Sequence, residues 1–122
     1  MPTRRRTDQG TVTAEFALLF PVLMATIIAG VWCVGLVITN IRCVDAARDV
    51  ARAVARGETE AAAQSIGKKA APKNATIEIQ TTNGQIQVTV KTARAVDWPL
   101  FAPLPNIPVE AEATLQSEPG EP

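Results

Sequence analysis

The chain has 122 residues, twelve of them basic and twelve acidic, so its formal net charge is zero. A neutral chain has no global field that would attract nucleic acid. The absence of histidine removes the commonest general base and the commonest neutral metal ligand. The length allows one small folded domain beside any membrane segment.

The first ten residues are polar and basic, with Arg4, Arg5 and Arg6 at their centre and Gly10 at their end. Nothing in this stretch is expected to fold. By the positive-inside rule the three arginines should hold this end of the chain in the cytoplasm. We therefore predict a cytoplasmic basic leader over residues 1–10.

An uncharged apolar run of 23 residues follows, from Phe16 to Ile38. As an α-helix it would span about 35 Å, enough to cross a hydrocarbon core of about 30 Å. This predicts a single transmembrane helix over residues 11–39. Glu15 stands at its entrance, where an acid costs less than the roughly 2.5–3.5 kcal/mol estimated near a bilayer centre. That cost would rise if the helix moved into a dry bundle of like helices.

The helical pattern continues beyond the apolar run as an amphipathic segment, and Gly57 is a natural stop. Together the two parts predict one helix over about residues 12–56, roughly 65 Å long. Small and β-branched residues share one face of the second part: Ala47, Val50, Ala51 and Val54. Two acid–base pairs three residues apart are expected on its other face: Asp45–Arg48 and Asp49–Arg52.

The remainder predicts a short second helix over 58–71 and then a change to alternating apolar and polar residues. Alternation over 75–80, 85–90 and 109–115 predicts three strands, and Asn83-Gly84 predicts a tight hairpin between the first two. The fold class is thus α+β: a long N-terminal transmembrane helix continuing into an amphipathic helix, a short second helix and a three-stranded antiparallel sheet. Residues 40–122 form a small extracytoplasmic domain with a proline-rich loop over 95–108.

One face of this sheet should be buried against the long helix through Val50 and Val54. The apolar residues assigned to that face by their alternation are Ile77, Ile79, Ile86, Val88, Val90 and Leu115.

No motif indicates catalysis, since the chain has no phosphate loop, no Cys/His metal spacing and no nucleophile elbow. The close acid pairs Asp45/Asp49 and Glu110/Glu112 are interpreted as solvated faces. Cys33 and Cys43 would be about 15 Å apart on one helix, too far for a disulfide, and are interpreted as packing residues. We predict no catalytic residue, no metal and no cofactor, and hence no enzyme.

The stretch Gly10-TVTAEFALLFPVLM, with its basic leader and with Pro21 six residues after the acid, resembles the TadE-like minor pilins of the tight-adherence type IV pilus. The Ala/Arg-rich stretch 46–57 is similar to their post-membrane helix. The resemblance covers roughly residues 8–57. It implies cleavage between Gly10 and Thr11 and an assembly role for Glu15, which would meet the new amine of a neighbouring subunit. The major pilins of this system are much shorter, which favours a minor subunit. Residue 11 departs from better-known pilins, where a methylated Phe or Met is common.

The function implied is that of a minor pilin or pseudopilin, stored in the membrane, cut by a prepilin peptidase and used in pilus assembly. Its partners would be the peptidase, other pilins and minor pilins, and the membrane that it spans once, with no nucleic acid. Its C-terminal domain would lie outside the cytoplasm, and at the pilus or cell surface after processing. The alternative is an uncleaved signal-anchor protein whose outer domain binds an envelope partner. A soluble secreted protein fits less well, because the apolar run exceeds the usual signal-peptide core.

Overall fold

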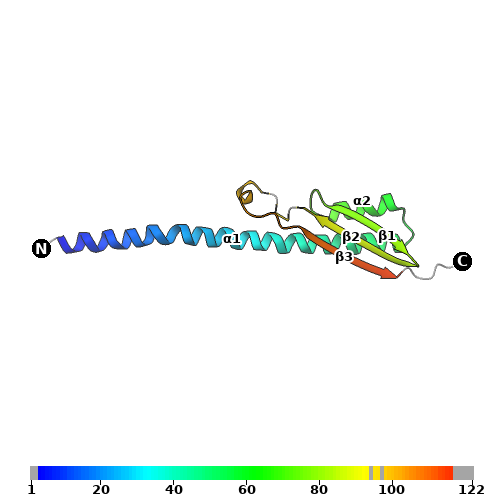
Figure 1. Ribbon diagram of the computed structural model, residues 1–122, viewed down its shortest axis with the longest axis horizontal. Coiled ribbons are helices and arrows are strands. Elements are labelled where there is room, and N and C mark those ends of the chain that lie inside the picture. The colour runs from blue at the N-terminus through cyan, green and yellow to red at the C-terminus, as the bar shows by residue number, and fades with distance from the viewer. Residues whose placement is uncertain (1–2, 94, 97, 117–122) are drawn as a thin grey trace. The chain divides into compact units, whose positions relative to one another are not determined.

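The computed structural model describes residues 3–93, 95–96 and 98–116, with the backbone alone described at residues 3–8. Its elements confirm the predicted α+β class (Figure 1). In chain order they are α1 (Thr3–Ala55), α2 (Glu60–Ala70), β1 (Thr76–Thr82), β2 (Gln85–Thr92), the 3-10 helix η1 (Pro99–Phe101) and β3 (Val109–Gln116). The chain divides into two compact units, Met1–Val34 and Gly35–Pro122, which are described separately below.

The first unit is the N-terminal part of α1. The expectation that residues 1–10 do not fold is wrong from Thr3 onward, because α1 begins there. Extending an existing helix adds one hydrogen bond per residue without a new nucleation cost, and no proline interrupts the stretch from Thr3 to Gly10. Pro21 lies inside the helix without ending it.

In the second unit α1 ends at Ala55, just before the predicted stop at Gly57, whose φ of 86° places it in the left-handed region that glycine adopts readily. Its amide donates to the carbonyl of Val54 at 2.9 Å, and the Glu58 amide donates to the carbonyl of Ala53 at 3.1 Å. These two bonds form a Schellman motif, which satisfies carbonyls that the helix end would leave unpaired. Thr59 then caps α2, its hydroxyl accepting a hydrogen bond from the Ala62 amide.

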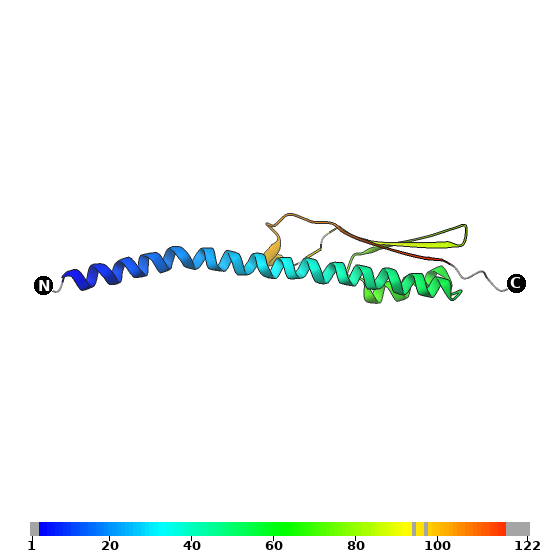
Figure 2. The same ribbon diagram turned by 90° about the horizontal axis from the view of Figure 1, so that it is seen from below.

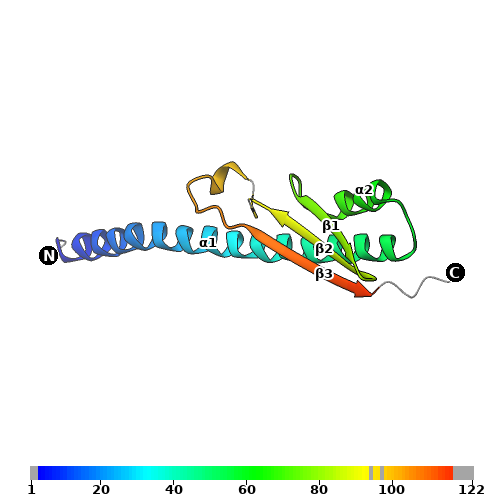
Figure 3. The same cartoon turned by 45° about the vertical axis from the view of Figure 1, so that its right-hand side comes forward.

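The sheet is an antiparallel meander with β2 in the centre, between β1 and β3 (Figure 3). The predicted hairpin is confirmed: Asn83 and Gly84 have φ of 51° and 77°, as a tight two-residue turn requires. The register places Val88 between Ile79 and Ala113, and it places Val90 between Ile77 and Ala111.

Both helices cover the same face of this sheet (Figure 2). The residues that alternate onto its other face are mainly polar. The predicted buried face is confirmed in the central strand, where Ile86, Val88 and Val90 are at most 2% exposed. Burying each of these side chains contributes about 1.5–3 kcal/mol. Small residues on α1 let the helix backbone approach the sheet closely, and all of the following are fully buried: Cys43, Ala46, Ala47, Val50, Ala51 and Ala53.

Two expectations about side chains are corrected. Leu115 faces α1 as assigned, but it is 36% exposed because it lies near the end of an edge strand. The pairs expected at Asp45–Arg48 and Asp49–Arg52 do not form, since side chains at the surface gain little from such contacts. Among the described residues, the ion pair that forms is Arg56–Glu58, at 2.8 Å.

Helix α2 reaches the core at Gly67, which is buried. A β-carbon built at this position would collide with a methyl group of Val50 on α1, and it would lie 2.7 Å from Cδ1 of Ile77 on β1. Glycine is therefore needed at residue 67 for space and not for backbone conformation.

We expect Gly67→Val to destabilise the second unit by about 1–3 kcal/mol, the usual effect of overpacking a core. The fully buried thiol of Cys43 provides the readout, since it reacts with maleimide only when this unit opens. In full-length protein with Cys33→Ala, labelling of Cys43 should accelerate. Ser65→Val is the matched control, because Ser65 is exposed on the same helix. Equal labelling rates for the two variants would contradict the close approach at Gly67.

Candidate processing and assembly site

The residues singled out in the sequence lie on successive turns of α1. Thr11 and Glu15 are four residues apart and therefore share one face of the helix, about 6 Å apart along its axis. Side chains on a helix lean toward its N-terminus, so the Glu15 carboxylate leans toward the level of Thr11. An amine created at Thr11 and this carboxylate would therefore lie on one face of the helix.

Glu15 itself is exposed and has no hydrogen bond or ion pair within the part of the chain that the structure describes. Its surroundings are apolar and equally exposed: Val12 is 63% exposed, Phe16 69% and Leu19 64%. A carboxylate in such a setting remains hydrated, or it takes a cation from another molecule once the apolar side chains around it are covered.

Gly10 has no structural reason to be glycine within this chain. A β-carbon built there meets nothing within 4 Å, and Gly10 is not one of the glycines with positive φ. Glycine also lowers helix stability by about 0.8–1.0 kcal/mol relative to alanine. The residue is therefore a weak point in α1, at the bond where the resemblance places the cut.

The rest of the first unit is suited to lipid. Among the described residues, α1 is the one helix long and apolar enough to cross a membrane. Its large side chains are exposed, with Leu18 at 75%. The hydroxyl of Thr26, in the middle of the run, donates to the carbonyl of Val22 at 2.8 Å, so it needs no water. Cys33 is exposed along this run, so its interpretation as a packing residue is wrong for the single chain, whereas Cys43 is buried as expected.

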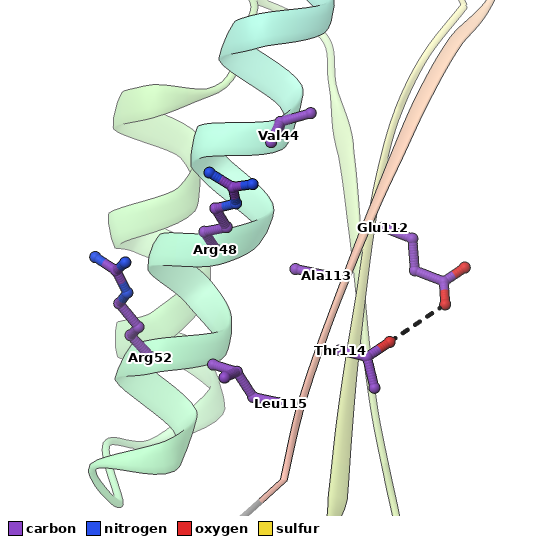
Figure 4. Close-up of a pocket in the computed structure, with 7 residues that line it drawn as sticks. All are labelled: Val44, Arg48, Arg52, Glu112, Ala113, Thr114 and Leu115. Carbon is purple, nitrogen blue, oxygen red and sulfur yellow. Dashed lines mark hydrogen bonds between the residues drawn. The ribbon is translucent and has the colours of Figure 1, made fainter.

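The second unit contains a groove of about 370 Å³ between α1 and β3 (Figure 4). Val44, Arg48 and Arg52 line it from the helix, and β3 lines it from Glu112 to Leu115. Leu115 points toward the helix, while Glu112 points away from it. The Glu112 carboxylate accepts hydrogen bonds from the Thr114 hydroxyl and from the side-chain amide of Gln87. The two arginines have no ion pair among the described residues. This mixture of cationic and apolar groups suits binding.

Burial also affects the one titratable thiol of the second unit, since desolvation raises the pKa of Cys43. A buried, protonated thiol is a poor nucleophile, which agrees with a packing role.

The structure thus places Gly10 and Thr11 next to each other on one helix, with Glu15 one turn later. The side chains of Arg4, Arg5 and Arg6 lie outside the described part of the chain, and their anchoring role stays a prediction. The groove at Arg48 and Arg52 was not foreseen. Its signal was the two arginines four residues apart on α1, but the strand that faces them could not be assigned from the sequence.

Known proteins resemble this chain in two comparisons. The family model described as "TadE: TadE-like protein" matches residues 10–52, the segment that contains Gly10, Glu15 and the apolar run. A protein of Mycobacterium tuberculosis named "Apoptosis inhibitor Rv3655c" is 30% identical over 106 residues, which cover 87% of this chain and 78% of that protein. No solved structure matches. The chain belongs to the TadE-like family, whose members are membrane proteins related to the Tad pilus.

Proposed function

We propose that the protein is a minor pilin of a Tad-type pilus, held in the membrane as a precursor, cut between Gly10 and Thr11 and then assembled with other pilins. Residues 1–10 are the cytoplasmic leader, residues 11–39 the membrane span and residues 40–122 the extracytoplasmic domain. The observation that carries the proposal is Glu15, an exposed acid without a partner in the described chain, one helical turn after the proposed new N-terminus.

The state of the N-terminus would control assembly. Before the cut, the α-amine lies ten residues before Thr11 and the leader arginines keep that end in the cytoplasm. After the cut, the amine begins the helix, where the helix dipole adds positive potential. A neighbour's Glu15 entering a dry helix bundle would pair with this amine, because an unpaired charge there costs several kcal/mol. The pair would fix the axial register of neighbouring subunits.

Gly10 would serve the peptidase in two ways. It lets an enzyme approach the backbone closely, and it helps α1 to open locally at the bond to be cut. The second point matters because α1 is continuous through Gly10 and Thr11, and a helical peptide bond is shielded by its own turn.

We expect Gly10→Leu to block processing while leaving the helix and its insertion intact, because leucine stabilises a helix and has open space at this position. Intact-mass measurement of the membrane form, in cells with an active prepilin peptidase, should show residues 1–10 retained in the variant and removed in the native protein.

The same measurement separates the alternative. If the native protein also retains residues 1–10 in those cells, it is an uncleaved signal anchor whose outer domain binds an envelope partner. In that case Gly10 and Glu15 have no processing role.

A further inference from the structure

The segment between β2 and β3 presents unusual side chains to its surroundings. Residues 98–107 contain no charged residue. Trp98 is 57% exposed and Leu100 is 55% exposed, while Phe101, whose ring lies 5.7 Å from that of Trp98, is 4% exposed. The segment therefore has one buried aromatic anchor and an exposed apolar tip, which needs a covering environment.

The residues that lead into this segment, just before its exposed apolar tip, are attached to α1. The hydroxyl of Thr39 donates to the carbonyl of Ala95, a contact between residues 56 positions apart in the sequence, and both residues are buried. Four residues earlier on α1, a β-carbon on Gly35 would lie 2.8 Å from a methyl group of Val96. The start of the segment is therefore packed directly on α1.

The attachment point lies at the end of the apolar run. Gly35 belongs to the run, which ends at Ile38, and Thr39 follows it directly. Around this point the apolar side chains of α1 are open, since Val37 is 58% exposed, Ile38 46% and Ile41 53%. Within the second unit, the start of the segment thus lies at the same height along the axis of α1 as the end of the membrane span.

The backbone of the segment is also suited to a place with little water. Three of its residues are prolines, which have no amide hydrogen: Pro99, Pro103 and Pro105. Three further amides are satisfied within the segment, because Phe101 donates to Trp98, Ala102 to Pro99 and Leu104 to Phe101, at 2.9–3.2 Å. Few donors remain to be hydrated, which lowers the cost of removing water.

We propose that the segment 98–107 is a membrane-interface anchor that inserts Trp98 and Leu100 into the lipid headgroup region around the end of the span. Tryptophan favours this region because its ring is apolar and its N–H can still reach water or a headgroup. Lipid is the occupant that fits best, because the segment is tied to the very helix that continues into the bilayer. The anchor would fix how far the outer domain stands from the membrane. The inference depends on the membrane span alone and not on a role in a pilus.

The test uses the full-length chain in vesicles of phosphatidylcholine and phosphatidylglycerol. The Trp32→Phe substitution leaves Trp98 as the single tryptophan. We expect lipids brominated near the headgroup to quench most of its fluorescence, lipids brominated at the chain ends to quench much less, and aqueous acrylamide to have little effect.

A reporter elsewhere in the same domain provides the control. Thr82→Trp, made together with Trp32→Phe and Trp98→Phe, places the single tryptophan at the exposed hairpin end of β1. It should be quenched by acrylamide and not by brominated lipid. The proposal is overturned if Trp98 behaves like this control. It is also overturned if neither quencher reaches Trp98 and this protection is lost when the protein is diluted into excess lipid. Such a result would mean that a second protein molecule covers Trp98. Neither outcome changes the expected cleavage at Gly10, so this test and the processing test fail independently.

Discussion

Glu15→Ala is expected to abolish incorporation into pili while leaving membrane insertion and processing intact. Insertion should survive because the substitution makes the helix more apolar. Cleavage should survive because the bond between Gly10 and Thr11 is untouched. Assembly should fail because the amine of a neighbouring subunit would then be buried without a partner, which costs several kcal/mol per contact. Glu15→Gln should be intermediate at best, since it keeps a hydrogen bond and loses the charge.

The measurement is piliation together with subunit crosslinking, in cells that express each variant at an equal level. Thr13→Ala is a suitable control, because it lies two residues away and removes only a hydroxyl that bonds the carbonyl of Gln9 at 2.9 Å. It should assemble normally. Normal pili and normal crosslinks for Glu15→Ala would show that the carboxylate is an ordinary surface group. That result would favour the alternative, in which the protein is an uncleaved signal anchor.

A double variant tests whether the amine and the acid act as one pair. Gly10→Leu keeps the amine on the leader, so it should impair assembly as Glu15→Ala does. If both substitutions remove the same ion pair, the double variant should be no worse than either single one, because their effects are then not additive. Additive partial losses would indicate that Gly10 and Glu15 contribute to assembly separately.

The helices α1 and α2 and the three strands could be predicted because local signals mark each of them. The apolar run, the stop at Gly57 and the Asn83-Gly84 turn each reflect a requirement of length or backbone geometry. The change from helical to alternating spacing separated helix from strand. The helical start at Thr3 was missed because the leader has no apolar periodicity, and its helix is propagated from the run that follows.

The contacts that position the second unit could not be predicted in the same way. Gly67 gives no local sign of its contacts with Val50 and Ile77, and it was included in the predicted helix without any packing role. The contact from Thr39 to Ala95 joins positions 56 residues apart, and neither residue belongs to a recognisable motif. Such pairings depend on how whole elements meet, and a single sequence does not display that.

Charge substitutions on the buried face of the sheet are expected to have a large effect on the stability of the second unit. Three positions form a graded series: Val88 is fully buried in the central strand, Ile79 is half-buried beside it, and Gln80 is exposed on the opposite face. An aspartate at Val88 would place a charge among apolar side chains of both neighbouring strands and α1, with no cation among them. An uncompensated buried charge costs about 3–5 kcal/mol.

We therefore expect stability losses in the order Val88→Asp, Ile79→Asp, Gln80→Asp, with the last close to zero. The readout is again maleimide labelling of Cys43 in full-length Cys33→Ala protein, because Cys43 lies in the same core. Each 1.4 kcal/mol lost should accelerate labelling about tenfold, so Val88→Asp should label at least about a hundredfold faster than its parent. The pH should be kept neutral and constant. Burial raises the pKa of Cys43, so the folded state holds the thiol proton more tightly, and stability falls as the pH rises past the thiol's ordinary pKa of 9.0. If Gln80→Asp accelerates labelling as much as Val88→Asp does, the assigned faces of the sheet are wrong.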